Sequence, residues 1–282
     1  MDALVTTEWL ASELGQPGLV VLDASYTATL PGSPVREPRA EYDAGHIPGA
    51  RFLDLDTLAD LASPLPSMLP PAALFVERMR ALGVGNDDRV VLYDAGLHHT
   101  ACRAWWVCRM FGLGNVAILD GGINKWKAEQ RALSDKAETP APSSFELRPA
   151  LAEVRTMADM HANIESGAEQ VADARSAARF TGAEGDPRGI CAPGHIPGSR
   201  NIPSGSFFHA DGTWKQGDEL RAVFDAAGVD LARPLAATCG SGITAAIIAF
   251  GAHLLGRDAA IYDGSWTEWG ADPATPKALG PA

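Results

Sequence analysis

The sequence repeats itself once, and this repeat limits the fold more than any other feature does. The pentapeptide Gly-His-Ile-Pro-Gly occurs at Gly45–Gly49 and again at Gly194–Gly198. Three further matches accompany it in the same order: VVLDAS with VADARS, ALGVGNDDRVVLYDAG with AAGVDLARPLAATCGSG, and AILDGGINKW with AIYDGSWTEW. The offset between the copies falls only from about 150 residues to 143, so we interpret the chain as a duplicated domain.

The length agrees with a duplication. A chain of 282 residues has room for two domains of about 100–150 residues each. The segment 136–148 between the copies is rich in proline and small polar residues, as exposed linkers are. We therefore predict a first domain over residues 1–135 and a second over residues 149–282.

Short apolar runs alternate with helical patterns in both copies. The patterns predict buried strands over residues 90–93 and 235–238. The first strand is followed by a predicted helix over 101–111, and the second by one over 244–255. A further helix is predicted over 156–166. This alternation predicts an α/β fold in which each domain has a parallel sheet with helices on both faces. Ligands of such sheets bind beyond the carboxyl ends of the strands, where loops lead into helices.

Composition excludes several classes of function. The formal net charge of −12 argues against nucleic acid or an anionic membrane as the main partner. Four cysteines in a chain of this length are no disulfide scaffold, and their spacing does not suggest zinc. No metal or organic cofactor is implied. The N-terminal residues do not resemble a signal peptide, and no apolar run could span a membrane, so a cytoplasmic location is expected.

Aligning the copies on the predicted strand places Asp94 opposite Cys239. In the second copy the cysteine ends a strand, Gly-Ser-Gly-Ile-Thr follows, and a helix begins. Glycines let successive backbone N–H groups converge on one centre, and the helix N-terminus adds partial positive charge. Such a loop should stabilise a thiolate at Cys239, the nucleophilic form of cysteine. The carboxylate of Asp94 could help to form a cleft wall but could not carry sulfur.

Two other interpretations of this loop were weighed. Free cysteines are often small core residues, which we expect of Cys102 and Cys108, but a glycine-rich turn at a strand–helix junction favours function for Cys239. A phosphatase would need an arginine six positions after the cysteine to bind phosphate, and that position is Ala245. Cys191, just before the second GHIPG, could approach the site as a resolving thiol.

The paired GHIPG motifs, the Asp-Gly…Trp segments and a cysteine loop in the second copy alone resemble the tandem rhodanese family over nearly the whole chain. The resemblance implies two rhodanese domains, an inactive first copy and a catalytic second copy. The loop CGSGIT is similar to the CGSGVT of the 3-mercaptopyruvate sulfurtransferase branch. The thiosulfate branch typically has CRKGVT, whose cationic pair is replaced here by the neutral Gly240 and Ser241.

The same resemblance suggests roles for individual residues. Cys239 would carry a persulfide, with Ser241 and Thr244 as hydroxyl partners, and Gly240, Gly242 and Ile243 would complete the substrate-binding loop. Arg179 and Arg188, in ARFTGAEGDPRG, are similar to the family's substrate-binding arginines. A planar guanidinium can bind the carboxylate of a substrate with two hydrogen bonds. The alternative is that both arginines are solvent-exposed loop residues that bind no ligand.

The first copy supplies further candidates. Asp60 and Arg103 are candidate cleft residues, with a surface or structural role as the alternative for Arg103. The family often has a histidine in SPLPHMLP that is proposed to act with Asp60 and the loop serine. Here Ser67 stands in its place, so that relay is incomplete. His46 and His195, in the GHIPG turns, are expected to be structural, whereas His98 and His99 could lie at the mouth of the cleft.

We therefore predict a sulfurtransferase that moves sulfur from a small anionic donor, 3-mercaptopyruvate, through Cys239 to a thiol such as thioredoxin or to cyanide. A thiosulfate:cyanide sulfurtransferase is the nearest alternative. A persulfide carrier without catalytic turnover is a further one.

Overall fold

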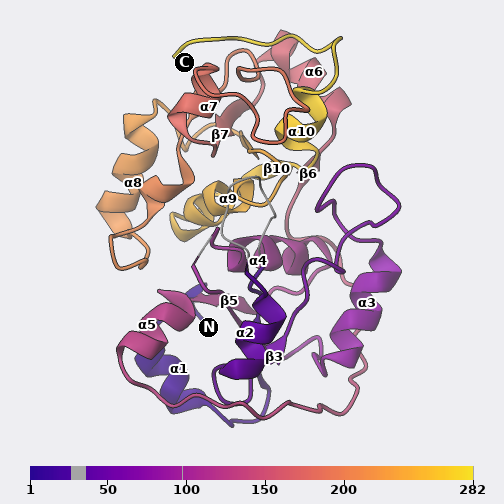
Figure 1. Cartoon of the computed structure of the whole chain (residues 1–282), viewed down its shortest axis with the longest axis vertical. Helices are drawn as coiled ribbons and strands as arrows, with labels where there is room; N and C mark the ends of the chain where they lie inside the picture. The colour runs from indigo at the N-terminus through magenta and orange to yellow at the C-terminus, as the bar shows by residue number, and fades with distance from the viewer. Residues whose placement is uncertain (27–35, 97, 282) are drawn as a thin grey trace.

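The computed structural model describes residues 1–26, 36–96 and 98–281, and these residues form two similar halves (Figure 1). Each half contains a five-stranded sheet whose strand pairs are all parallel. The strand orders, β1-β5-β4-β2-β3 and β6-β10-β9-β7-β8, are equivalent under the sequence repeat. The predicted α/β class with two rhodanese-like sheets is confirmed. No helix in the described ranges is long and apolar enough to cross a membrane.

The first half occupies the lower part of Figure 1. Its elements are β1 (Leu4–Val5), α1 (Thr7–Glu13), β2 (Leu19–Asp23), α2 (Pro38–Ala44), β3 (Arg51–Phe52), α3 (Ala72–Ala81), β4 (Arg89–Tyr93), α4 (Ala101–Met110), β5 (Val116–Leu119) and α5 (Gly122–Ala128).

The second half lies above it, in orange to yellow for most of its length. Its elements are β6 (Val154–Arg155), α6 (Met157–Ser166), β7 (Gln170–Asp173), α7 (Ala177–Thr181), β8 (Arg200–Asn201), a 3-10 turn (Ser204–Phe207), α8 (Gly217–Ala226), β9 (Leu235–Thr238), α9 (Ala245–Leu254), β10 (Ala260–Tyr262) and α10 (Ser265–Trp269).

The strands and helices predicted from the sequence are present within one residue of their expected bounds. Strand β9 is buried at every position, as a central parallel strand covered on both faces must be. Helix α9 is buried from Ala245 to Ala252 because its residues are apolar on all sides. Thr156 is the N-cap of α6, and its side chain forms a capping box with Asp159.

Helices α4 and α9 pack against each other between the two sheets (Figure 1). One hydrophobic core extends across this interface, where the rings of Trp105 and Phe250 meet edge to face at 5.0 Å between centroids. Each half also donates a backbone N–H to an aspartate of the other. Leu69 N binds Asp263 Oδ2 at 2.7 Å, and Trp214 N binds Asp120 Oδ1 at 2.8 Å.

Candidate active site

Cys239 follows directly on β9 and is 1% exposed. Helix α10 holds its loop through four hydrogen bonds. Trp266 N donates to Cys239 O at 3.0 Å, Cys239 N donates to Ser265 Oγ at 3.2 Å, and Gly240 O accepts from both Thr267 N at 2.8 Å and Thr267 Oγ1 at 2.6 Å. Because the backbone on both sides of the thiol is bonded to one helix, the position of Cys239 is fixed by the fold.

Gly242 is required at the centre of the loop. Its φ of +79° lies in the left-handed region, which favours glycine. A Cβ at this position would stand 2.7 Å from the carbonyl oxygen of Asp263. The loop can therefore lie against Asp263 only because residue 242 has no side chain.

The loop carries a run of unused backbone donors. Among the described residues, none of the N–H groups of residues 240–245 donates a hydrogen bond to a protein acceptor. These groups belong to the turn between Cys239 and the first turn of α9, where the helix dipole favours negative charge. The loop can therefore bind an anion beside the thiol.

The first copy shows what the equivalent loop binds. There, Asp94 Oδ1 accepts from Gly96 N at 2.6 Å and Asp94 Oδ2 accepts from Ala101 N at 2.8 Å. Asp94 lines a cavity of about 210 Å³ together with residues of its own domain and the 210–214 turn, and no residue of the Cys239 loop contributes to that cavity. Asp94 thus supplies an internal anion to its own loop and does not face Cys239.

Both predicted substrate-binding arginines lie beside Gly240. Arg179 Nη2 is 3.5 Å from the point where a Cβ on Gly240 would stand. Arg188 Nη2 donates to Thr267 Oγ1 at 2.9 Å, and this hydroxyl in turn donates to Gly240 O at 2.6 Å. The two guanidinium groups are therefore brought together next to the cysteine loop.

Asp186 neutralises part of this charge. Its side chain is fully buried, 2.9 Å from Arg188 Nη2 and 3.5 Å from Arg179 Nη2. Burial would raise the pKa of the Asp186 carboxyl, but the hydrogen bonds and charge of Arg188, helped by Arg179, outweigh burial and hold this pKa below its usual range. Two cations against one carboxylate leave a net positive charge beside the thiol.

Arg103 reaches the loop from the other half. Its Nη1 lies 2.6 Å from Asp263 Oδ1 and 3.4 Å from Gly242 O, and its Nη2 donates to Ser67 O. The side chain is 3% exposed. Arg103 is thus buried at the domain interface and does not face solvent.

The other candidates make fewer contacts. Ser241, Ile243 and Thr244 lie in the loop, but the two hydroxyl groups form no hydrogen bond within the described residues. Asp60 Oδ1 accepts from Ala62 N at 3.0 Å within its own turn. Asp60 makes no described hydrogen bond to the cysteine loop, whereas the backbone of Ser67 reaches that loop through Arg103.

The histidines of the GHIPG turns are structural in their contacts. His46 and His195 are buried, and their Nδ1 atoms lie 2.8 Å from Tyr42 O and 2.9 Å from Phe180 O, respectively. His99 stacks on Phe208 across the domain interface, with 3.5 Å between ring centroids. Burial lowers its pKa, so its neutral form is favoured.

The other three cysteines lie outside the loop that follows β9. Cys102 and Cys108 are core residues, as expected, and burial raises the pKa of both thiols. Cys191 is half-buried, with Sγ 4.0 Å from Thr267 O, and burial raises its pKa as well. Cys191 is therefore placed close to α10 but is not activated as a nucleophile.

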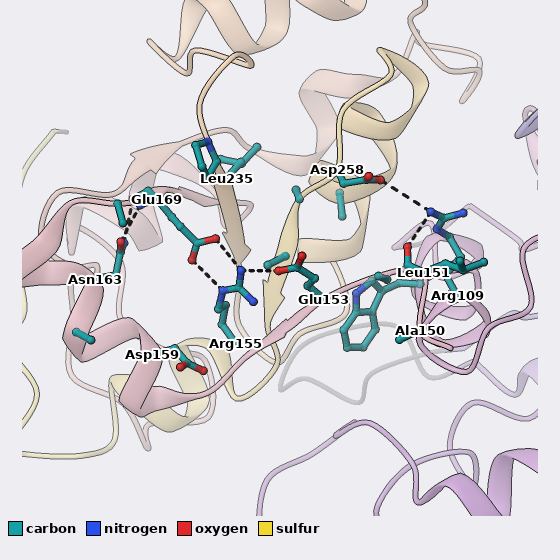
Figure 2. A pocket seen from close by; sticks show the side chains of 18 of the residues that line it. Arg109, Ala150, Leu151, Glu153, Arg155, Asp159, Asn163, Glu169, Leu235 and Asp258 are labelled. Atoms are coloured by element: carbon teal, nitrogen blue, oxygen red, sulfur yellow. Dashed lines mark hydrogen bonds and ion pairs between the residues drawn. The ribbon is translucent and has the colours of Figure 1, made fainter. Parts of the chain in front are cut away.

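A large cavity of about 830 Å³ lies elsewhere (Figure 2). It is lined by the first residues of β9 and β10, so it is at the opposite end of the sheet from Cys239. Several of its charged groups are paired with one another: Arg155 binds Glu153 at 2.6 Å and Glu169 at 2.9 Å. No cysteine is among the described residues that line this cavity, which lies away from Cys239.

Sequence reasoning did not single out Asp186, Asp263, Ser265 or Thr267. Asp263, Ser265 and Thr267 lie in the repeated AIYDGSWTEW segment, so the repeat contained a signal for them. Asp186 lies between the two arginines in ARFTGAEGDPRG. An acidic residue between two arginines could have indicated that it forms ion pairs with them.

Comparison with known proteins agrees with this geometry. The model of the rhodanese-like domain matches residues 6–129 and again residues 156–272. The human 3-mercaptopyruvate sulfurtransferase is 45% identical over 95% of this chain and 91% of its own length. The bovine thiosulfate sulfurtransferase is 42% identical over the same shares. The crystal structure of SseA from Escherichia coli, a 3-mercaptopyruvate sulfotransferase with the rhodanese fold, has a TM-score of 0.85 and 36% identity over 94% of this chain and 99% of SseA.

The chain belongs to the rhodanese family and consists of two tandem rhodanese-like domains. The sulfurtransferases named above, to which the chain is similar over nearly its whole length, are enzymes of that family.

Proposed function

We propose that this chain is a sulfurtransferase that takes sulfur from 3-mercaptopyruvate. The Cys239 thiolate attacks the thiol sulfur of the donor, an S–S bond forms and the C–S bond breaks. The carbon that loses sulfur takes up a proton, so the products are the Cys239 persulfide and pyruvate. A dithiol acceptor such as reduced thioredoxin then removes the outer sulfur as hydrogen sulfide and becomes a disulfide, or cyanide removes it as thiocyanate.

The cysteine loop carries this proposal. It combines a thiol with backbone N–H groups at residues 240–245 that have no acceptor within the described residues, and its counterpart in the first copy uses the same kind of groups to bind the carboxylate of Asp94. A persulfide is anionic near neutral pH and could occupy the corresponding position beside Cys239. The loop would therefore stabilise the intermediate without a cofactor.

The donor carboxylate has suitable partners. Arg179 and Arg188 leave a net positive charge after pairing with Asp186, and Arg179 Nε is buried without a partner in the described part of the chain. A buried donor without an acceptor is costly, and a bound carboxylate would satisfy it. We propose that these two arginines hold the ketoacid carboxylate while its thiol meets Cys239.

Thiosulfate is the alternative donor because thiosulfate sulfurtransferases are among the similar proteins. The neutral Gly240 and Ser241 favour the monoanionic ketoacid, since the loop itself presents no side-chain cation to a dianion. We also propose a reducing compartment such as the cytoplasm, because all four cysteines are free.

The test compares kcat/KM for 3-mercaptopyruvate and thiosulfate, with Cys239→Ser as the inactive variant and Cys191→Ser as a matched control. We expect 3-mercaptopyruvate to be preferred and Cys191→Ser to retain activity. A strong preference for thiosulfate would overturn the choice of donor. Persulfide on Cys239 without turnover of either donor would instead indicate a carrier.

A further inference from the structure

Arg103 connects the inactive half to the catalytic loop. It lies in the first turn of α4, which packs against α9 (Figure 1). Its guanidinium contacts three acceptors that belong to separate segments: the Asp263 carboxylate, the Gly242 carbonyl and the Ser67 carbonyl. One side chain thus joins the first half, the cysteine loop and the segment that leads into α10.

Asp263 completes this arrangement. Its Oδ1 binds Arg103 and its Oδ2 accepts from Leu69 N at 2.7 Å, so both oxygens are bonded to the first half. A Cβ on Gly242 would stand 2.9 Å from Oδ1 of this carboxylate. The ion pair is therefore in contact with the backbone of the loop that bears Cys239.

The first copy serves as an internal comparison. Its matching aspartate, Asp120, also accepts a backbone N–H from the other half, from Trp214. The helix position that matches Arg103, third in α9 as Arg103 is third in α4, is the buried Ile247. Burial raises the pKa of the Asp120 carboxyl, which pairs with no guanidinium among the residues that the structure describes. The buried ion pair is thus found beside the loop that carries the cysteine and not beside the other.

A buried ion pair is a poor general source of stability, because the loss of hydration offsets much of the attraction. The Arg103–Asp263 pair matters here because it fixes the relative positions of the groups that it contacts. The planar guanidinium reaches three acceptors at once, which the single ammonium of lysine does not do in the same arrangement. The contact with Gly242 O constrains the turn of residues 240–245, whose N–H groups have no acceptor in the described part of the chain.

We propose that Arg103 is a positioning residue through which the inactive half holds the Cys239 loop in its anion-binding conformation. This inference rests on the proposed role of Cys239 as the sulfur carrier. The role is distinct from substrate binding, since Arg103 contacts backbone and Asp263 and is buried away from solvent.

The test compares three variants of the full chain: Arg103→Lys, the double variant Arg103→Met with Asp263→Asn, and Arg109→Met as the matched control. The double variant removes both charges, so no buried charge is left unpaired. Arg109 is on the same helix, and it lies over the Trp105 ring much as Arg103 lies over the Trp106 ring. It binds Leu151 O and Asp258 at the cavity of Figure 2. It has no contact with the cysteine loop among the hydrogen bonds of the described residues.

Two readouts are needed besides the melting temperature. The first is steady-state turnover of 3-mercaptopyruvate, with kcat and KM determined separately. The second is the pH dependence of Cys239 alkylation by iodoacetamide, followed by peptide mass spectrometry, which requires no sulfur donor. Failure of the wild type to form a persulfide would count against the proposed function, whereas the alkylation profile tests Arg103 alone.

We expect kcat of both Arg103 variants to fall about 10- to 100-fold, the effect of losing charge-assisted hydrogen bonds, with a much smaller change in KM. Alkylation should require a higher pH than in the wild type. Arg109→Met should match the wild type in both readouts. Wild-type kcat and alkylation in folded Arg103→Lys or in the double variant would overturn the inference, as would an equal loss in Arg109→Met.

Discussion

Replacing Gly242 with alanine tests how closely the cysteine loop lies against Asp263. The control is Gly198→Ala, because both glycines have a φ of +79° and a Cβ on Gly198 would meet no atom within 4 Å. The left-handed backbone costs either alanine about 1–2 kcal/mol, and alanine recovers about 0.4–1 kcal/mol by restricting the unfolded chain. Gly198→Ala should therefore lose about 0–1.6 kcal/mol.

Gly242→Ala should lose more because its Cβ would stand 2.7 Å from Asp263 O and 2.9 Å from Asp263 Oδ1. Overpacking of this kind costs about 1–3 kcal/mol, so we expect a difference of about that size between the two variants in urea unfolding. Persulfide formation should fail in Gly242→Ala and persist in Gly198→Ala. Equal stability and equal persulfide formation in the two variants would refute this account of the loop.

Three further predictions concern single side chains. Hydrogen bonds from Lys125 and Thr7 lower the pKa of Glu129 to about 2. The contribution of Glu129 to the free energy of unfolding is therefore present above pH 4.5 and is lost as the pH falls toward 2. Glu129→Gln should cost about 1 kcal/mol in urea unfolding near neutrality and nothing below pH 2. Ser265 has a φ of +50°, so Ser265→Ala should be about 1 kcal/mol less stable than Ser265→Gly in the same assay. Arg188→Lys should raise KM for 3-mercaptopyruvate about tenfold in steady-state kinetics. An unchanged free energy of unfolding in Glu129→Gln, equal stability of the two Ser265 variants, or an unchanged KM in Arg188→Lys would contradict the prediction concerned.

Much of the fold follows from local pattern and from the repeat. The run that became β9 contains no charged residue because both faces of the strand are covered, and α9 was recognisable because its apolar residues leave no polar face. The alignment of Asp94 with Cys239 also identified which half could carry sulfur. These features depend on neighbours in sequence or on a comparison between the copies.

The contacts that shape the site were harder to predict because they join distant segments. Arg103 and Asp263 are 160 residues apart in the sequence. Neither the periodicity of hydrophobic residues nor the spacing of motifs predicts that two such distant residues form an ion pair. Asp186 was overlooked because a carboxylate beside two arginines reads equally well as a solvated loop. The exact domain boundaries and the roles of Ser241 and Thr244 stay predictions.

Mass spectrometry of the intact chain after incubation with 3-mercaptopyruvate tests most directly whether Cys239 carries the sulfur. We predict a gain of one sulfur atom that maps to the Cys239 peptide, is removed by cyanide, persists in Cys191→Ser and disappears in Cys239→Ser. The same gain in a folded Cys239→Ser variant, or its location on Cys191, would contradict the account.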